Sequence, residues 1–188
     1  MGWGRPSLNA AEERGDRSVM ARSLMYLFAA GGAVTLMSLL IPAEHDTARI
    51  AITGVSAFGI AGVLLIAYDR IPIWGFQIFL AAGTVLVEWA IYASGDATSP
   101  YAMFYFWIAI YAFYFLSRFR ASLQMAFIGM AYSGALVTNG DIHTTPVIHW
   151  LFVTSTLVVA GAFIGVQRGH VDRLIDRLSS ARSPAACP

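Results

Sequence analysis

Charged residues are scarce in this chain. Asp, Glu, Lys and Arg together make up 12% of the 188 residues, whereas 57% are hydrophobic. A soluble domain of ordinary composition carries about 25% charged residues. The shortage of charge therefore excludes an ordinary soluble domain.

Cysteine is almost absent, and the familiar catalytic motifs are missing. Cys187 is the only cysteine, so neither an intrachain disulfide nor a cysteine-based metal site is possible. The chain contains no G-x-x-x-x-G-K-[ST], H-E-x-x-H or G-x-S-x-G motif and no dinucleotide-binding glycine pattern. No apolar run pairs a nucleophile with a histidine. We therefore expect no enzymatic activity, no cofactor and no metal in this chain.

Long apolar runs are what the chain has instead. A helix that spans a bilayer needs about 20 apolar residues. The runs are continuous rather than alternating, which favours helices over the strands of a membrane barrel. The sequence therefore predicts an all-α integral membrane protein, a six-transmembrane-helix bundle in the lipid bilayer. The expected spans are Ser23–Ile41, Ile50–Tyr68, Ile71–Ala93, Tyr101–Ser117, Ala121–Val137 and Val147–Val166.

Short connections predict that consecutive helices are antiparallel neighbours. Only Asp69 and Arg70 separate the second and third spans, and residues 118–120 separate the fourth and fifth. Two longer loops, SGDATSP (94–100) and NGDIHTTP (139–146), share the Gly, Asp and Pro that turns favour.

The distribution of arginine predicts the orientation in the membrane. All twelve basic residues are Arg, and eleven of them lie before the first span, after the last span or in alternate loops, with only Arg49 in the other set of loops. Cytoplasmic loops carry such an excess of basic residues. We expect both termini of this multi-pass protein to be cytoplasmic. No basic patch beyond this bias remains, so nucleic acid is not an expected partner.

The chain divides into four expected segments. Residues 1–22 are predicted to be a flexible cytoplasmic tail, with helix from Ala10 onward as the alternative. Residues 23–166 form the membrane domain, residues 167–181 an amphipathic signalling helix, and residues 182–188 a disordered C-terminus.

Glu88 is the only carboxylate well inside a predicted span. An acidic residue near the centre of a membrane helix costs about 2.5 kcal/mol or more on insertion scales, and less toward the interface. Two interpretations remain open: a satisfied hydrogen bond between helices, or a group that senses a ligand or a proton.

The fourth span is unusually aromatic. The stretch YAMFYFWIAIYAFYFLSRF (101–119) carries aromatic side chains through its middle as well as at its ends, including Trp107, Tyr111 and Tyr114. Tyr and Trp need hydrogen-bond partners when they are away from water. The stretch predicts either a packed bundle core or an aromatic-lined pocket for a small apolar or planar ligand, with Glu88 nearby.

Acidic residues and histidines gather in the loops of the outer side. Carboxylates and imidazoles are common metal ligands, but their spacing here matches no metal motif, and the exclusion of Arg from these loops already leaves an acidic rim. We therefore expect no metal site. The residues are Glu44, His45, Asp46, Asp96, Asp141, His143 and His149.

Two stripes of residues lie near the C-terminal end of the chain. Gly161, Gly165 and Gly169 repeat at the spacing that lets membrane helices approach closely, and we assign them to packing within the bundle. The second stripe is predicted to contact a parallel partner in a homodimer. It consists of Val171, Leu174 and Leu178, with Ile175 beside it.

Two stretches resemble a known family. YAMFYFWIAIYAFYFLSRFRASLQMAFIGMAYSGAL (101–136) and the exit helix GHVDRLIDRLSSA (169–181) are similar to the N-terminal membrane region of bacterial diguanylate cyclases of the GGDEF type, especially those of actinobacteria. The likeness covers about residues 20–181. In that family the exit helix leads into a cytoplasmic GGDEF domain, which condenses two GTP into cyclic di-GMP as a dimer. Here the chain continues RSPAACP, without the GGDEF signature or its GTP site, so no catalytic residue carries over.

The resemblance implies a sensory or regulatory domain of the bacterial inner (plasma) membrane without its output domain, either truncated or free-standing. Such a domain would receive a signal, with an unknown small ligand as a possible partner, and pass it on through residues 167–181. The alternative is a small membrane transporter or channel that uses Glu88 and the aromatic fourth span. Against it, the prolines Pro42, Pro72, Pro100 and Pro146 lie at span ends and interrupt no helix.

Overall fold

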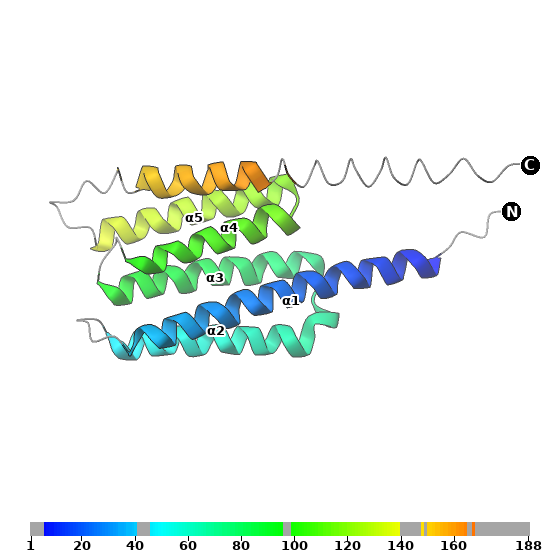
Figure 1. Ribbon diagram of the computed structural model, residues 1–188, viewed down its shortest axis with the longest axis horizontal. Coiled ribbons are helices and arrows are strands. Elements are labelled where there is room, and N and C mark those ends of the chain that lie inside the picture. Colours follow the sequence, from blue (N-terminus) through cyan, green and yellow to red (C-terminus); the bar gives the residue numbers. More distant parts are fainter. Residues whose placement is uncertain are drawn as a thin grey trace, which may run out of the picture.

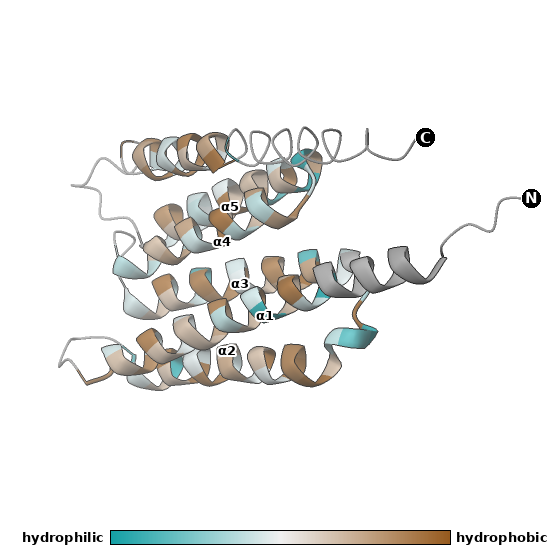
Figure 2. Ribbon diagram, turned by 45° about the vertical axis from the view of Figure 1, so that its right-hand side comes forward, coloured by the Kyte–Doolittle hydropathy of each residue, from teal (hydrophilic) through white to brown (hydrophobic). Residues whose placement is uncertain are grey.

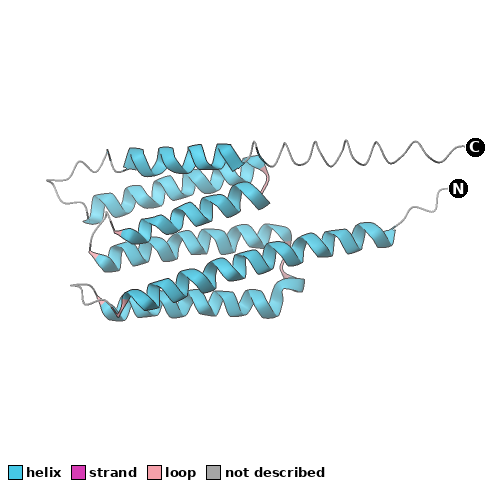
Figure 3. Cartoon of the chain, in the orientation of Figure 1, coloured by secondary structure: helices cyan, strands magenta, loops and turns pink. Residues whose placement is uncertain are grey.

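The computed structural model describes residues 6–40, 46–95, 99–139, 148, 150–164 and 167, and this part of the chain is helical with no strand (Figure 3). The helices are α1 (Pro6–Ser38), α2 (Thr47–Ala67), the 3-10 helix η1 (Tyr68–Arg70), α3 (Ile73–Ser94), the 3-10 helix η2 (Pro100–Met103), α4 (Phe104–Phe115) and α5 (Arg118–Asn139). A further helical segment, Trp150–Ile164, follows α5.

The helices run alternately up and down in one elongated bundle (Figure 1). The two expected tight connections are present: η1 joins α2 to α3, and two residues, Leu116 and Ser117, join α4 to α5. Leu116 has an extended backbone (φ −92°, ψ 160°), which ends α4 and reverses the chain. The prediction of antiparallel neighbours is confirmed for these two pairs.

Glycine and proline shape the connection between α3 and α4. Gly95 ends α3 in the left-handed conformation (φ 71°), which favours a residue without a Cβ, and its N–H donates to the carbonyl of Tyr92. Pro100 then starts η2. Proline is tolerated there because N–H groups in the first turn of a helix have no partner within the helix.

Four helices of the described residues are long and apolar enough to cross a membrane. They are Arg17–Ser38, Thr47–Arg70, Trp74–Ser94 and Arg118–Thr138. The expected fourth and sixth spans coincide with the shorter apolar helices Pro100–Phe115 and Trp150–Ile164. In its described residues the chain is thus a helical protein with several apolar helices, compatible with a membrane protein.

The N-terminal segment is helical from Pro6, which agrees with the alternative of a helix from Ala10 onward rather than with a flexible tail. α1 begins at Pro6 and continues without a break through the first span to Ser38, so it extends past the ends of its neighbours (Figure 1). Proline is favoured at the first position of a helix, and Ala10, Ala11, Glu12 and Glu13 are good helix formers. At 1.5 Å per residue, the 33 residues of α1 measure roughly 50 Å.

Hydrophobic residues occur along all the helices of the bundle (Figure 2), and many of their side chains are exposed on its outside. Large hydrophobic side chains such as Ile66, Phe119 and Val137 are 79–86% exposed. An apolar exterior of this extent would promote association in water, whereas lipid tails solvate it.

Glycines permit the closest helix contacts. On α1 and α2, a Cβ added at Gly32 would lie 3.0 Å from the carbonyl oxygen of Gly54, and one added at Gly54 would lie 2.7 Å from Cγ of Leu36. In Trp150–Ile164, a Cβ at Gly161 would overlap the ring of Phe113 on α4. The packing role predicted for Gly161 is therefore confirmed, while Gly165 and Gly169 lie outside the described residues.

The signalling helix predicted for residues 167–181, which contains Val171, Leu174 and Leu178, also lies outside the described residues. Gln167 is its one described residue. Residues 182–188, including Cys187, lie outside the described residues as well.

Candidate functional site

The carboxyl group of Glu88 is held between three helices. Glu88 lies on α3, and the hydroxyl of Tyr105 on α4 donates to its Oε2 at 2.7 Å. The backbone of Ala135 on α5 also hydrogen-bonds to this side chain. Tyr105 is fully buried, so its hydroxyl has little access to other partners. The first of the two interpretations of Glu88, a hydrogen bond between helices, is the one that the structure shows.

A second tyrosine completes the surroundings of this pair. The rings of Tyr105 and Tyr132 meet edge to face, with centroids 6.0 Å apart and an interplanar angle of 70°. Tyr132 belongs to α5 and is 2% exposed. The Glu88 side chain, itself only partly buried, thus faces the aromatic contact between α4 and α5.

One helical turn before Glu88, a second polar contact joins α3 to α5. Nε2 of Gln124 donates to Oγ1 of Thr84 at 2.8 Å, and the Thr84 hydroxyl donates to the carbonyl of Leu80 at 3.3 Å. Thr84 and Gln124 are 0% and 2% exposed. We did not predict this contact, although a lone glutamine in the apolar run ASLQMAFIGM was a visible signal.

Two other tyrosines of the aromatic stretch bond to α1. The hydroxyls of Tyr101 and Ser38 lie 2.5 Å apart, and the Tyr111 hydroxyl donates to the carbonyl oxygen of Met20 at 3.0 Å. Together with Tyr105, they fasten η2 and α4 to two different helices.

A cavity of about 60 Å³ lies between α1, α2, α3 and α4. Its walls are almost entirely apolar, and two threonines supply its only side-chain hydroxyls. The lining residues are Leu27, Phe28, Gly31, Thr35, Thr53, Ala57, Leu80, Gly83, Leu86, Val87, Ala90, Phe104, Trp107 and Ile108.

Both threonine hydroxyls that line this cavity donate within their own helices. Thr35 donates to the carbonyl of Gly31 at 2.8 Å, and Thr53 donates to that of Arg49 at 2.9 Å, both within their own helices. A buried water needs two to four polar partners, and a cavity lined by apolar groups stays dry. The cavity therefore suits a small apolar molecule better than water or an ion.

The four side chains predicted to bind a ligand do not meet at one place. Trp107 lines the cavity, whereas Glu88 is not among its lining residues and faces α4 and α5 instead. Tyr111 is buried against α1, and Tyr114 is 53% exposed and packs its ring 4.7 Å from that of Phe115. Sequence reasoning missed the small residues Gly31, Ala57 and Gly83, which make the space.

Arg49, at the start of α2, is held in a polar cluster. Asp46 caps α2 by accepting from the N–H of Arg49 (3.2 Å), and its Oδ2 lies 2.9 Å from Nε of Arg49. The Arg49 guanidinium lies 5.6 Å from the ring centre of Tyr92 on α3, and the Asp46 N–H donates to the carbonyl of Ala93. This cluster ties the start of α2 to the end of α3.

Within the described residues, no group of three His, Cys, Asp or Glu side chains is placed to hold a metal ion. Of the outer-loop residues considered above, only Asp46 is described. Glu44, His45, Asp96, Asp141, His143 and His149 lie outside the described residues.

Comparison with known protein families, with curated proteins and with solved structures finds no match. The resemblance to the membrane region of GGDEF-type cyclases therefore depends on the two sequence stretches alone.

Proposed function

We propose that the chain is a membrane sensory domain that binds a small apolar molecule in the cavity between α1 and α4. The observation that supports this most is the dry cavity itself, because α1 forms one of its walls and then continues out of the bundle to Pro6. A ligand that binds one arrangement of these helices better than another shifts the population toward it.

The size of the cavity limits the ligand. An engineered cavity of about 150 Å³ accepts benzene or xenon, whereas this one measures about 60 Å³. A molecule of two or three heavy atoms without a charge, such as a dissolved gas, fits this volume. Of the small apolar or planar ligands that the sequence suggested, the smallest apolar ones fit this volume, and larger planar ones would need the helices to move apart.

The proposed topology has six spans with both termini in the cytoplasm of a bacterial cell. Arg22, Arg70, Arg118 and Arg120 lie at one end of the described bundle, and Arg49 lies at the other in an ion pair. The helix Pro100–Phe115 measures roughly 24 Å at 1.5 Å per residue, against an apolar thickness of about 30 Å. Local thinning of the bilayer can accommodate such a difference.

The output in this proposal is the helix of residues 167–181, which would pair with its copy in a homodimer and pass the signal to a cytoplasmic partner. The sequence pattern of Val171, Leu174 and Leu178 supports it. A purified chain that remains monomeric in detergent and in nanodiscs, with or without residues 167–188, would remove the dimer from the proposal.

Xenon binding tests the cavity. We expect ¹²⁹Xe NMR to detect a bound environment in the purified chain, and Gly31→Val to abolish it, because the nearest side-chain atom to a Cβ at Gly31 is 4.0 Å away and the added methyl groups enter the cavity. Gly59→Val is the matched control, since it lies on α2 with no atom within 4 Å of a Cβ. Equal xenon signals in both variants would contradict a ligand site in this cavity.

A flux assay separates the sensor from the transporter. A transporter that uses Glu88 would lose ligand-driven flux in Glu88→Gln. We expect proteoliposomes with the wild-type chain and with Glu88→Gln to show no ligand flux above that of empty liposomes. The reason is that the Glu88 carboxyl is bonded to Tyr105 and does not line the cavity.

A further inference from the structure

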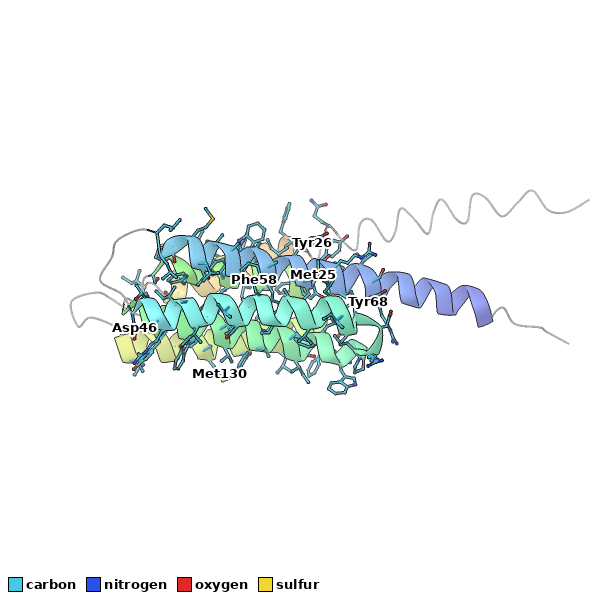
Figure 4. The ribbon with its side chains drawn as sticks, turned by 90° about the horizontal axis from the view of Figure 1, so that it is seen from below. Met25, Tyr26, Asp46, Phe58, Tyr68 and Met130 are labelled. Carbon is cyan, nitrogen blue, oxygen red and sulfur yellow. The ribbon has the colours of Figure 1, made fainter. Side chains whose placement is uncertain are left out.

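A groove of about 100 Å³ runs between α1 and α2 at the end of the bundle that carries most of the described arginines. Its lining residues are Ala21, Arg22, Met25, Leu64, Leu65 and Tyr68. Figure 4 shows Met25 on α1 and Tyr68 at the end of α2 on the same side of the molecule. This groove is separate from the cavity discussed above and shares no residue with it.

The groove is polar at its rim and apolar one turn deeper, along both helices. On α1, Arg22 comes first and Met25 follows three residues later. On α2, Leu64 and Leu65 precede Tyr68 by four and three residues. Residues three or four apart lie on the same face of a helix, so the two walls change from polar to apolar at a similar depth.

The change from a polar rim to apolar residues one turn deeper matches the headgroup and the acyl chains of a phospholipid. Tyr68 is 37% exposed at the end of a membrane-spanning helix, where tyrosine rings commonly lie at the level of the lipid headgroups. The Arg22 guanidinium and the Tyr68 hydroxyl are donors suited to a phosphate, and Leu65, which is 61% exposed, offers apolar surface to an acyl chain.

The charges around the groove favour an anionic lipid over a zwitterionic one. No carboxylate lines the groove, so no side chain in it would form an ion pair with the ammonium of a zwitterionic headgroup. Among the described residues, Arg22 has no ion-pair partner, since the one ion pair there joins Arg49 to Asp46. Asp69, the nearest acidic residue along the chain, lies in η1 outside the lining.

We propose that this groove binds one anionic phospholipid of the cytoplasmic leaflet, with its phosphate at Arg22 and Tyr68 and one acyl chain against Met25, Leu64 and Leu65. The bound lipid would cover the seam between α1 and α2 where α1 leaves the membrane.

Native mass spectrometry of the full chain tests the site. The detergent-purified protein is titrated with dioleoyl phosphatidylglycerol and, separately, with dioleoyl phosphatidylcholine. We expect one phosphatidylglycerol to bind more tightly than phosphatidylcholine, and Arg22→Gln to weaken it about fivefold, the loss of one basic residue near an anionic surface. Arg118→Gln is the matched control, because it removes an exposed arginine outside the groove.

One further variant keeps the result decisive. Met25→Trp retains Arg22 but fills the groove, and we expect it to weaken phosphatidylglycerol binding while far-UV circular dichroism shows the same helix content. Equal losses in Arg22→Gln and Arg118→Gln would show general attraction to charge and overturn the proposal, as would full retention in Met25→Trp. Displacement of the lipid by an equal concentration of inorganic phosphate would overturn the assignment to a lipid.

Discussion

The tyrosines of η2 and α4 connect helices through their hydroxyl groups. Tyr101 and Tyr111 bond to Ser38 and to the Met20 carbonyl on α1, and Tyr105 bonds to Glu88 on α3. In a lipid environment, packing and such hydrogen bonds replace the hydrophobic effect as the forces between helices. Three tyrosines of the aromatic stretch thus make contacts between helices.

Removal of one hydroxyl tests the bond at Glu88. Tyr105→Phe leaves the buried ring in place but removes the donor to Oε2. We expect the free energy of unfolding in detergent to fall by about 0.6 kcal/mol and by no more than about 1.7 kcal/mol. Tyr26→Phe, on a side chain that is 66% exposed, is the control and should change it less. A larger loss for Tyr26→Phe would contradict the assignment.

The contact between Thr84 and Gln124 allows a double-mutant cycle. Gln124→Leu or Thr84→Val alone leaves one buried polar group without this partner, and we expect each to destabilise the bundle by about 1–3 kcal/mol. The double variant should lose less than the sum of the two, because two apolar partners can replace a hydrogen-bonded pair. Strict additivity in the unfolding free energies would show that the two side chains do not interact.

Glu88 was identifiable from the sequence, whereas its partners were not. A carboxylate in an apolar run is visible without a structure. The choice of Tyr105 rather than Tyr111 or Tyr114 depends on how α4 is rotated about its axis. That rotation is not encoded in a polar face, because lipid and core are both apolar and the run is apolar on all sides.

At the scale of the helix, the apolar runs predicted the elements well. The expected spans Ile50–Tyr68 and Ile71–Ala93 match α2 and α3 to within three residues at each end. The N-terminal end of α1 was left open between a flexible tail and a helix from Ala10 onward, because a charged segment outside the membrane can be helix or coil with similar composition. The expected span Tyr101–Ser117 agrees with the helical residues Pro100–Phe115 to within two residues at each end, but its division into η2 and α4 was not predicted.

Gly161 provides a test at this scale. A Cβ there overlaps the Phe113 ring, so Gly161→Ala should displace the helix Trp150–Ile164 from α4 and cost about 1–3 kcal/mol of stability. Gly62→Ala, with no atom within 4 Å of the added Cβ, should be neutral or slightly stabilising. Thermal unfolding in detergent measures both.

A second substitution separates steric overlap from other causes. Phe113→Ala removes the ring that the new methyl group meets, so we expect it to restore part of the stability lost in Gly161→Ala. Losses that simply add would indicate that Gly161 acts through something other than its contact with Phe113.

For the whole molecule, the proposed topology can be measured with thiol labelling. In a Cys187→Ser background, we expect a membrane-impermeant maleimide to label Thr47→Cys from outside intact spheroplasts and to label Ser117→Cys only after lysis. Both positions are exposed at opposite ends of the bundle. The reverse pattern would place the arginine-rich end outside and overturn the orientation.

The continuity of α1 has a mechanical consequence. Gly31 lies at the cavity and Pro6 lies 25 residues earlier on the same unbroken helix, roughly 37 Å away at 1.5 Å per residue. When such a rigid helix tilts about a point near Gly31, its far end moves in proportion to this length. A tilt of about 5° at Gly31 moves Pro6 by roughly 3 Å. A change too small to disturb the packing around the cavity would therefore become a displacement of atomic size at the N-terminal end of α1.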